Sequence, residues 1–166
     1  MRFTTADAAK VKPANYHITT FFIGNLAPAQ LENVVNACDE FIERAGSALH
    51  AFDITLMDIV SWQKPKILAA IPDQTPEVLA KLNKLSQKAA AVARPAITHQ
   101  HASFRPHVTL YRKVRPEQIL APLVKPSVTF TIKQLHLFES VSGSSGVTYP
   151  IRFSWPLAPA FSHRLG

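Results

Sequence analysis

The sequence contains one short motif twice, at residues 17–21 (HITTF) and at residues 107–111 (HVTLY). Both copies run histidine, β-branched residue, threonine, variable residue, aromatic residue. A single His-x-Thr is weak evidence, because such short patterns often arise by chance. Two copies with matching neighbours indicate an internal duplication. The repeated motif therefore marks the residues whose chemistry has to be explained.

The spacing within each motif places histidine and threonine together. On a β-strand, residues i and i+2 point to the same face, so His17 projects beside Thr19 and His107 beside Thr109. Two imidazoles on opposite sides of a phosphate can cleave a phosphodiester by general acid–base catalysis. One takes a proton from the attacking oxygen and the other gives a proton to the leaving oxygen. Imidazole suits both roles near neutral pH, because its unperturbed pKa is about 6.5.

The two threonines complete this hypothesis. A hydroxyl group can donate a hydrogen bond to a non-bridging phosphate oxygen, where negative charge gathers in the transition state. The alternative is structural: each histidine ends a strand, and each threonine is present as a good β-former. For one motif the structural interpretation is favoured, whereas the matched pair favours catalysis.

Strands must hold these motifs. Residues 16–23 and 107–114 are rich in β-branched and aromatic side chains, which predicts a strand at each motif. Alternation over residues 52–57 and the apolar run 66–71 predict two more strands, joined as a hairpin.

Two amphipathic helices are expected between the motifs. Apolar residues recur at helical spacing over residues 28–45, and Gly46 follows where a C-terminal cap belongs. A second helix is predicted from Thr75 as N-cap and Pro76 at the first helical position, to about Ala93.

The C-terminal third is predicted to be β-structure. Alternation over residues 128–137 changes phase near Lys133, which predicts a bulge, and a last strand is expected over residues 147–153. The whole chain thus has about six strands and two helices in an α+β order. Without a long linker, it is predicted to form one domain over residues 1–166.

Composition narrows the class of protein. The chain has 166 residues, a net charge of +7, and a single cysteine, Cys38, which lies on the apolar stripe of the first helix. It lacks an apolar run of about 20 residues, so no membrane span is predicted. One cysteine and no signal-peptide pattern favour a reducing, cytoplasmic location. The basic surplus favours an anionic partner such as nucleic acid, although it also fits a protein whose charge serves solubility alone.

The motifs HITT at residues 17–20 and HVTL at residues 107–110 resemble the signature of the two-histidine (2H) phosphoesterase superfamily. The wider strings NYHITTFFIG and FRPHVTLYRK are similar to its RNA 2′,3′-cyclic phosphodiesterase branch, also called 2′-5′ RNA ligase. The resemblance covers nearly the whole chain. It implies a duplicated, two-lobed fold whose antiparallel sheets face each other across a cleft, with helices outside. It also implies metal-independent opening of RNA 2′,3′-cyclic phosphates to 2′-phosphates, without a cofactor, and in some members 2′-5′ joining of tRNA halves.

The resemblance also implies roles for individual residues. His17 corresponds to the proton donor to the leaving 3′-oxygen, and His107 to the base that activates water. Thr19 and Thr109 correspond to the residues that hold the phosphate. Arg112 lies where the family often has a basic residue near the phosphate.

Further expectations concern the substrate and the N-terminus. Phe22 and Tyr149 match aromatic positions near the cleft, where they would stack on a base or simply pack in the core. The family begins with a strand and a helix before the first motif, and the residues before His17 hold neither convincingly. The first lobe is therefore expected to lack a strand. A homodimer is favoured to cover the exposed strand, and the alternatives are a strand supplied by the arm of residues 2–11 and a lobe that stays incomplete.

The remaining basic and histidine residues allow other interpretations. His99, His101 and His107 have spacing that could bind a metal ion, but no carboxylate lies nearby, so no metal site is predicted. Lys64, Lys66, Lys113 and Arg115 form either a basic rim for RNA or a solvated face. An esterase for a small cyclic nucleotide, such as ADP-ribose 1″,2″-cyclic phosphate, and a non-catalytic RNA-binding module are alternative functions.

Overall fold

A computed structural model describes residues 8–94, 103–115, 125–144 and 146–160. The chain divides into two compact units, each assembled from segments far apart in sequence. The first unit comprises residues 1–19, 54–75 and 105–130, and the second comprises residues 20–53, 76–104 and 131–166. Both histidine motifs begin in the first unit.

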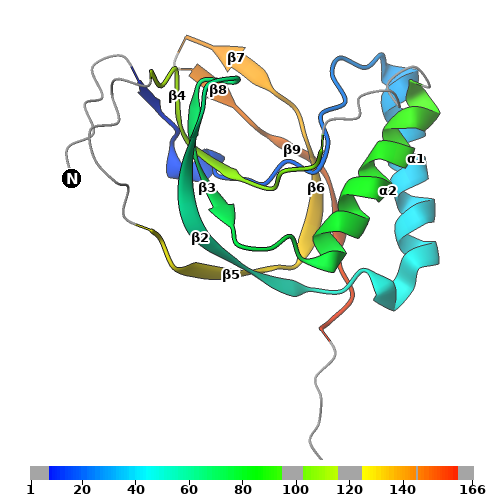
Figure 1. Ribbon diagram of the computed structural model, residues 1–166. Coiled ribbons are helices and arrows are strands. Elements are labelled where there is room, and N and C mark those ends of the chain that lie inside the picture. The colour runs from blue at the N-terminus through cyan, green and yellow to red at the C-terminus, as the bar shows by residue number, and fades with distance from the viewer. Residues whose placement is uncertain (1–7, 95–102, 116–124, 145, 161–166) are drawn as a thin grey trace, which may run out of the picture. The chain divides into compact units, whose positions relative to one another are not determined.

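The first unit is organised around a five-stranded sheet with the order β1-β4-β3-β2-β5 (Figure 1). Its strands are β1 (Ala9–Lys10), β2 (Phe52–Trp62), β3 (Ile67–Pro72), β4 (Val108–Arg112) and β5 (Val128–Ile132). The predicted hairpin is confirmed, because β2 and β3 pair in antiparallel register from Trp62 opposite Ile67. β2 is longer than expected, because its pairing with β3 continues beyond Met57 to Trp62.

The strand predicted for residues 16–23 is wrong. Among the described residues, Ile18 is the one member of that segment that pairs, through an isolated antiparallel bridge to Val108 of β4. The backbone bends at Thr20, whose carbonyl oxygen accepts a 2.6 Å hydrogen bond from the side chain of Asn83. The Thr20 hydroxyl is also bonded, at 2.9 Å, to that of Ser86. These contacts with the helix α2 (Glu77–Ala93) divert the chain from the sheet.

The N-terminal arm contributes a strand despite its weak β-forming sequence. In β1, Ala9 lies opposite Arg112 and Lys10 opposite Tyr111 of β4. The pairing continues with a 2.9 Å hydrogen bond from the Val11 N–H to the Leu110 carbonyl oxygen. A 3₁₀ turn at Pro13–Asn15 (η1) then leads to the first motif. The arm therefore covers part of the outer edge of β4.

The second unit packs two helices against a strand pair. The helix α1 (Pro28–Ala45) has the predicted bounds, and Gly46 follows it at φ 51°, a left-handed conformation that favours glycine. Figure 1 shows α1 and α2 side by side. α2 begins at Glu77 with Pro76, rather than Thr75, in the N-cap position. A 3₁₀ turn, η2 (Gly46–Ala48), follows α1. The strand β6 (Gln134–Phe138) pairs with β9 (Ile151–Pro156), and β7 (Val141–Gly143) pairs with β8 (Gly146–Thr148).

The phase change at Lys133 is a change of sheet rather than the predicted bulge. β5 ends at Ile132 in the five-stranded sheet, and β6 begins at Gln134 and pairs with β9. A one-residue break reverses which side chains face the core, and the new register buries Leu135.

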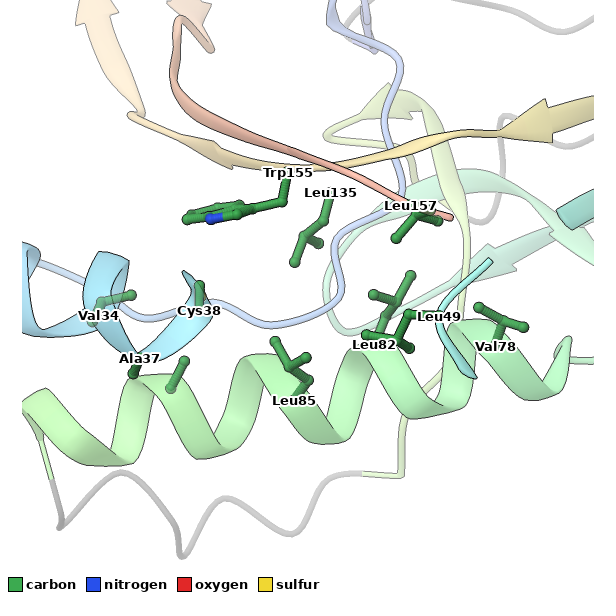
Figure 2. Close-up of a cluster of buried hydrophobic side chains, with 11 residues drawn as sticks. Val34, Ala37, Cys38, Leu49, Val78, Leu82, Leu85, Leu135, Trp155 and Leu157 are labelled. Atoms are coloured by element: carbon green, nitrogen blue, oxygen red, sulfur yellow. The ribbon is translucent and has the colours of Figure 1, made fainter. Parts of the chain in front are cut away.

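Each unit has its own apolar cluster. In the second unit, Leu135, Trp155 and Leu157 lie opposite the apolar face of α2 (Figure 2). Cys38 of α1 belongs to this cluster, and burial with the neighbouring Asp39 carboxylate raises its thiol pKa to about 11. The expectation that Cys38 packs in the core is confirmed. Within the described residues, no helix has the length and hydropathy needed to cross a membrane.

Candidate active site

The bridge between Ile18 and Val108 joins the two motifs. In antiparallel pairing, the residues on either side of a bridged pair lie opposite each other. His17 therefore lies across from Thr109, and Thr19 lies across from His107. All four occupy the face opposite to the bridged pair, because side chains alternate along extended backbone. The two motifs are thus related by a local pseudo-twofold axis through the bridge.

The two histidines occupy diagonal positions in this arrangement. Diagonal neighbours across an antiparallel pair lie roughly 7–8 Å apart, with their Cβ atoms somewhat closer. At that separation, two imidazoles can contact one phosphate group from either side. Both histidines are half-buried, which shields them from part of the solvent while leaving them accessible to a ligand.

The two imidazoles are held by matching hydrogen bonds. The Nδ1 of His17 donates to the carbonyl oxygen of Asn15 at 2.7 Å, and the Nδ1 of His107 donates to that of Arg105 at 2.8 Å. Because a main-chain carbonyl can only accept, Nδ1 carries the proton in both rings. Nε2 is consequently the nitrogen without a proton in the neutral form of each ring.

The bridged pair, Ile18 and Val108, packs on the face opposite to the histidines and threonines. Val108 is 6% exposed and belongs to a small apolar cluster with Leu56 and Ala70, against which Ile18 packs. Packing of the residue next to each histidine, Ile18 or Val108, restricts the backbone that carries the ring. The cluster therefore holds the two motifs in register.

Trp62 and Arg105 are site residues that the motif pattern did not identify. The indole ring of Trp62 meets the His107 ring edge to face, with centroids 4.8 Å apart and planes at 70°. The guanidinium carbon of Arg105 lies 5.3 Å from the Trp62 centroid, in cation–π geometry. One feature of the sequence could have identified Arg105 as a site residue, because it lies two residues before the motif histidine His107.

A bulge in β4 decides where Arg112 points. Leu68 pairs with Tyr111 and Ala69 pairs with Thr109, so consecutive residues of β3 span three residues of β4, with Leu110 as the extra one. Strict alternation would place Arg112 on the face away from His107. The extra residue reverses that phase and places Arg112 on the same face as Thr109.

Other residues named from the sequence lie elsewhere or outside the described chain. Phe22, with 74% of its surface exposed, and the half-buried Tyr149 both belong to the second unit, so their role in base stacking stays a prediction. His99 and His101 fall outside the described residues. In the part of the chain that is described, no three His, Cys, Asp or Glu residues cluster in a way that could hold a metal ion.

Solved structures share this fold. E. coli LigT complexed with 3′-AMP matches with a TM-score of 0.80 at 20% identity, over 94% of this chain and 84% of LigT. A protein described as a phosphoesterase matches with a TM-score of 0.80 at 19% identity, over 95% of this chain and 85% of its own. The protein TT0787 of Thermus thermophilus matches with a TM-score of 0.74 at 18% identity, over 93% and 84%. No curated protein sequence matches this chain.

The fold and the family match place the chain in the two-histidine phosphoesterase superfamily. The family model of the 2′-5′ RNA ligase superfamily matches residues 4–143. The chain belongs to that superfamily. The expected α+β fold of the 2H phosphoesterases is confirmed, as is the expected membership of the 2H phosphoesterase superfamily.

Proposed function

We propose that the protein hydrolyses RNA 2′,3′-cyclic phosphate ends to 2′-phosphomonoesters without a metal ion. One observation carries the proposal: the Ile18–Val108 bridge sets two His-Thr pairs on one face, with both imidazoles fixed through Nδ1. Membership of the 2′-5′ RNA ligase superfamily supports the choice of a phosphodiester at an RNA end.

The reaction needs two proton transfers on opposite sides of phosphorus. Nε2 of His107 accepts a proton from water while the water oxygen forms a bond to phosphorus. The bond from phosphorus to the 3′-oxygen breaks, and Nε2 of His17 donates its proton to that oxygen. The 2′-oxygen stays bonded to phosphorus, so the product carries a 2′-phosphate. The histidines then exchange protons with solvent and return to their starting states.

The threonines stabilise the charged phosphate during this reaction. Thr19 lies beside His107 and Thr109 beside His17, so each ring has a hydroxyl opposite it across the bridge. Donation to the non-bridging oxygens is strongest when their charge grows, which favours the transition state. If the 5′-hydroxyl of a second RNA replaces water, the same two transfers give a 2′-5′ linkage. We propose this ligation as a reversible second activity.

The test is an assay on a short RNA with a 2′,3′-cyclic phosphate end, in EDTA, with the phosphate position read by ³¹P NMR. The wild type is expected to yield only the 2′-phosphate, and His17→Ala and His107→Ala are each expected to be about 10²–10⁴-fold slower. His136→Ala is the matched control, since His136 lies in β6 with its Nδ1 bonded to Ser154. A 3′-phosphate product would refute the proposed reaction, and RNA binding without turnover would favour the non-catalytic module.

A further inference from the structure

A cationic pocket lies in the first unit, which also contains His17 and His107. It has a volume of about 510 Å³ and is formed where β3 begins and β4 ends. The described residues that line it are Pro65, Lys66, Ile67, Arg112, Lys113 and Arg115. Four of these six side chains are cationic and none is acidic, so the pocket is suited to an anion.

The backbone of the pocket is fixed by local structure. The N–H of Val114 donates to the carbonyl oxygen of Lys66 at 3.2 Å, which ties the end of β4 to the start of β3. The Val114 side chain is 2% exposed, whereas Lys113 and Arg115 on either side of it are exposed. Lys113 has φ 58°, a left-handed conformation that costs a non-glycine residue about 1 kcal/mol. A lysine is thus held at a position where the backbone favours glycine.

The pocket lies within reach of a ligand bound at the histidines. Thr109 pairs with Ala69, and Arg112 pairs with Ile67, which lies two residues earlier in β3. Two residues of a strand span about 7 Å. Because the bulge sets Arg112 on the same face as Thr109, an RNA chain leaving the catalytic phosphate along this face meets the cations after one or two nucleotides.

We propose that the cationic pocket binds a second phosphate of the same RNA, which makes an oligonucleotide, rather than a cyclic mononucleotide, the preferred substrate. This inference rests on the proposed function. A cyclic mononucleotide has one phosphate, already held by the histidines and threonines, and it leaves the pocket empty. Guanidinium groups from Arg112 and Arg115 match the geometry of a phosphate, and the two lysines add charge.

The variant Lys66→Gln/Lys113→Gly removes two pocket cations and leaves the histidine motifs untouched. Glycine at position 113 also suits the left-handed backbone, so folding should be preserved. The control, Lys84→Gln/Lys88→Gln, makes the same change in net charge on exposed positions of α2. Both are compared with the wild type on a cyclic-phosphate trinucleotide and on cytidine 2′,3′-cyclic phosphate.

We expect kcat/KM of the pocket variant to fall about tenfold or more on the trinucleotide and to stay unchanged on the mononucleotide. The slope of log(kcat/KM) against log salt should become shallower by about 0.7 for each phosphate that the pocket no longer binds. Equal losses on both substrates, or equal losses in the control, would overturn the proposal.

Binding separates this inference from the proposed function. Fluorescence anisotropy with a labelled trinucleotide that ends in a 3′-phosphate reports the pocket without any turnover. If the wild type hydrolyses neither substrate, the proposed reaction fails. Weaker binding in the pocket variant alone would still support the pocket, and equal binding in all three proteins would refute it.

Discussion

Ile18 and Val108 meet in a single antiparallel bridge, and each is the residue between a histidine and a threonine. Their side chains pack into one apolar cluster on the face away from the site. The pairing thus connects burial to chemistry: the contact that holds the two segments together also sets each histidine opposite the other motif's threonine. Register at this one pair decides the geometry of the candidate site.

The pH dependence should identify the acid and the base. In the wild type, kcat/KM should be bell-shaped, because one histidine must be protonated and the other neutral. His107→Ala should lose the acidic limb, since it removes the group that must be neutral, and His17→Ala should lose the basic limb. Each variant should be about 10²–10⁴-fold slower. Residual turnover measured across pH in both variants checks this, and interchanged limbs would reverse the two roles.

Activity should survive removal of divalent metal ions. The side chains of His17, Thr19, His107 and Thr109 supply every proton transfer and hydrogen bond in the proposed reaction. We therefore expect the same initial rate in EDTA as in buffer, measured after exhaustive dialysis against the chelator. A rate abolished in EDTA and restored by a divalent ion would instead support a metal site including His99, His101 and His107.

Trp62 should position the His107 ring. Trp62→Ala removes the edge-to-face contact at 4.8 Å and the surface on which Arg105 lies, so the imidazole gains freedom. We expect kcat to fall about tenfold with KM nearly unchanged, and Trp62→Phe to restore most of the loss. Circular dichroism and thermal unfolding of both variants control for folding. If the two variants lost activity in proportion to stability, Trp62 would be structural only.

Cys38 should resist thiol reagents until the protein unfolds. Its thiol pKa is raised to about 11 by burial and by Asp39, so little thiolate exists near neutral pH. Labelling with a disulfide reagent at pH 8 should be slow in the native protein and fast in denaturant. The unfolded thiol ionises near its ordinary pKa of 9.0, so the free energy of unfolding should fall as pH rises from about 9 to 11. The variant Cys38→Ala should lack this decrease when unfolding is measured by urea titration.

Self-association through the sheet of the first unit remains a prediction. β1 pairs with two residues of β4, and β5 forms the other edge of the described sheet, where Val128 is 53% exposed. Strand addition at such an edge should give a dimer whose fraction grows with concentration in light scattering. Val128→Lys should shift the equilibrium to monomer, because an edge lysine opposes pairing. A wild type that stays monomeric across the series would end the dimer hypothesis.

The sequence determined the parts of this protein that depend on local spacing. The helix over residues 28–45 was predicted with the bounds that the structure shows, because its apolar period and Gly46 act within a few residues. The β2–β3 hairpin and the two His-x-Thr motifs follow from short-range patterns in the same way, and so does the family resemblance that the comparisons confirm.

Tertiary structure decided what depends on distant partners. The segment after Ile18 leaves the sheet because Thr20 is bonded to α2, more than 60 residues further along the chain. Trp62 reaches His107, and the extra residue Leu110 sets the direction of Arg112, only through the pairing of separate strands. Such contacts are set by packing and register, which no local pattern encodes, and they place the side chains around the two histidines.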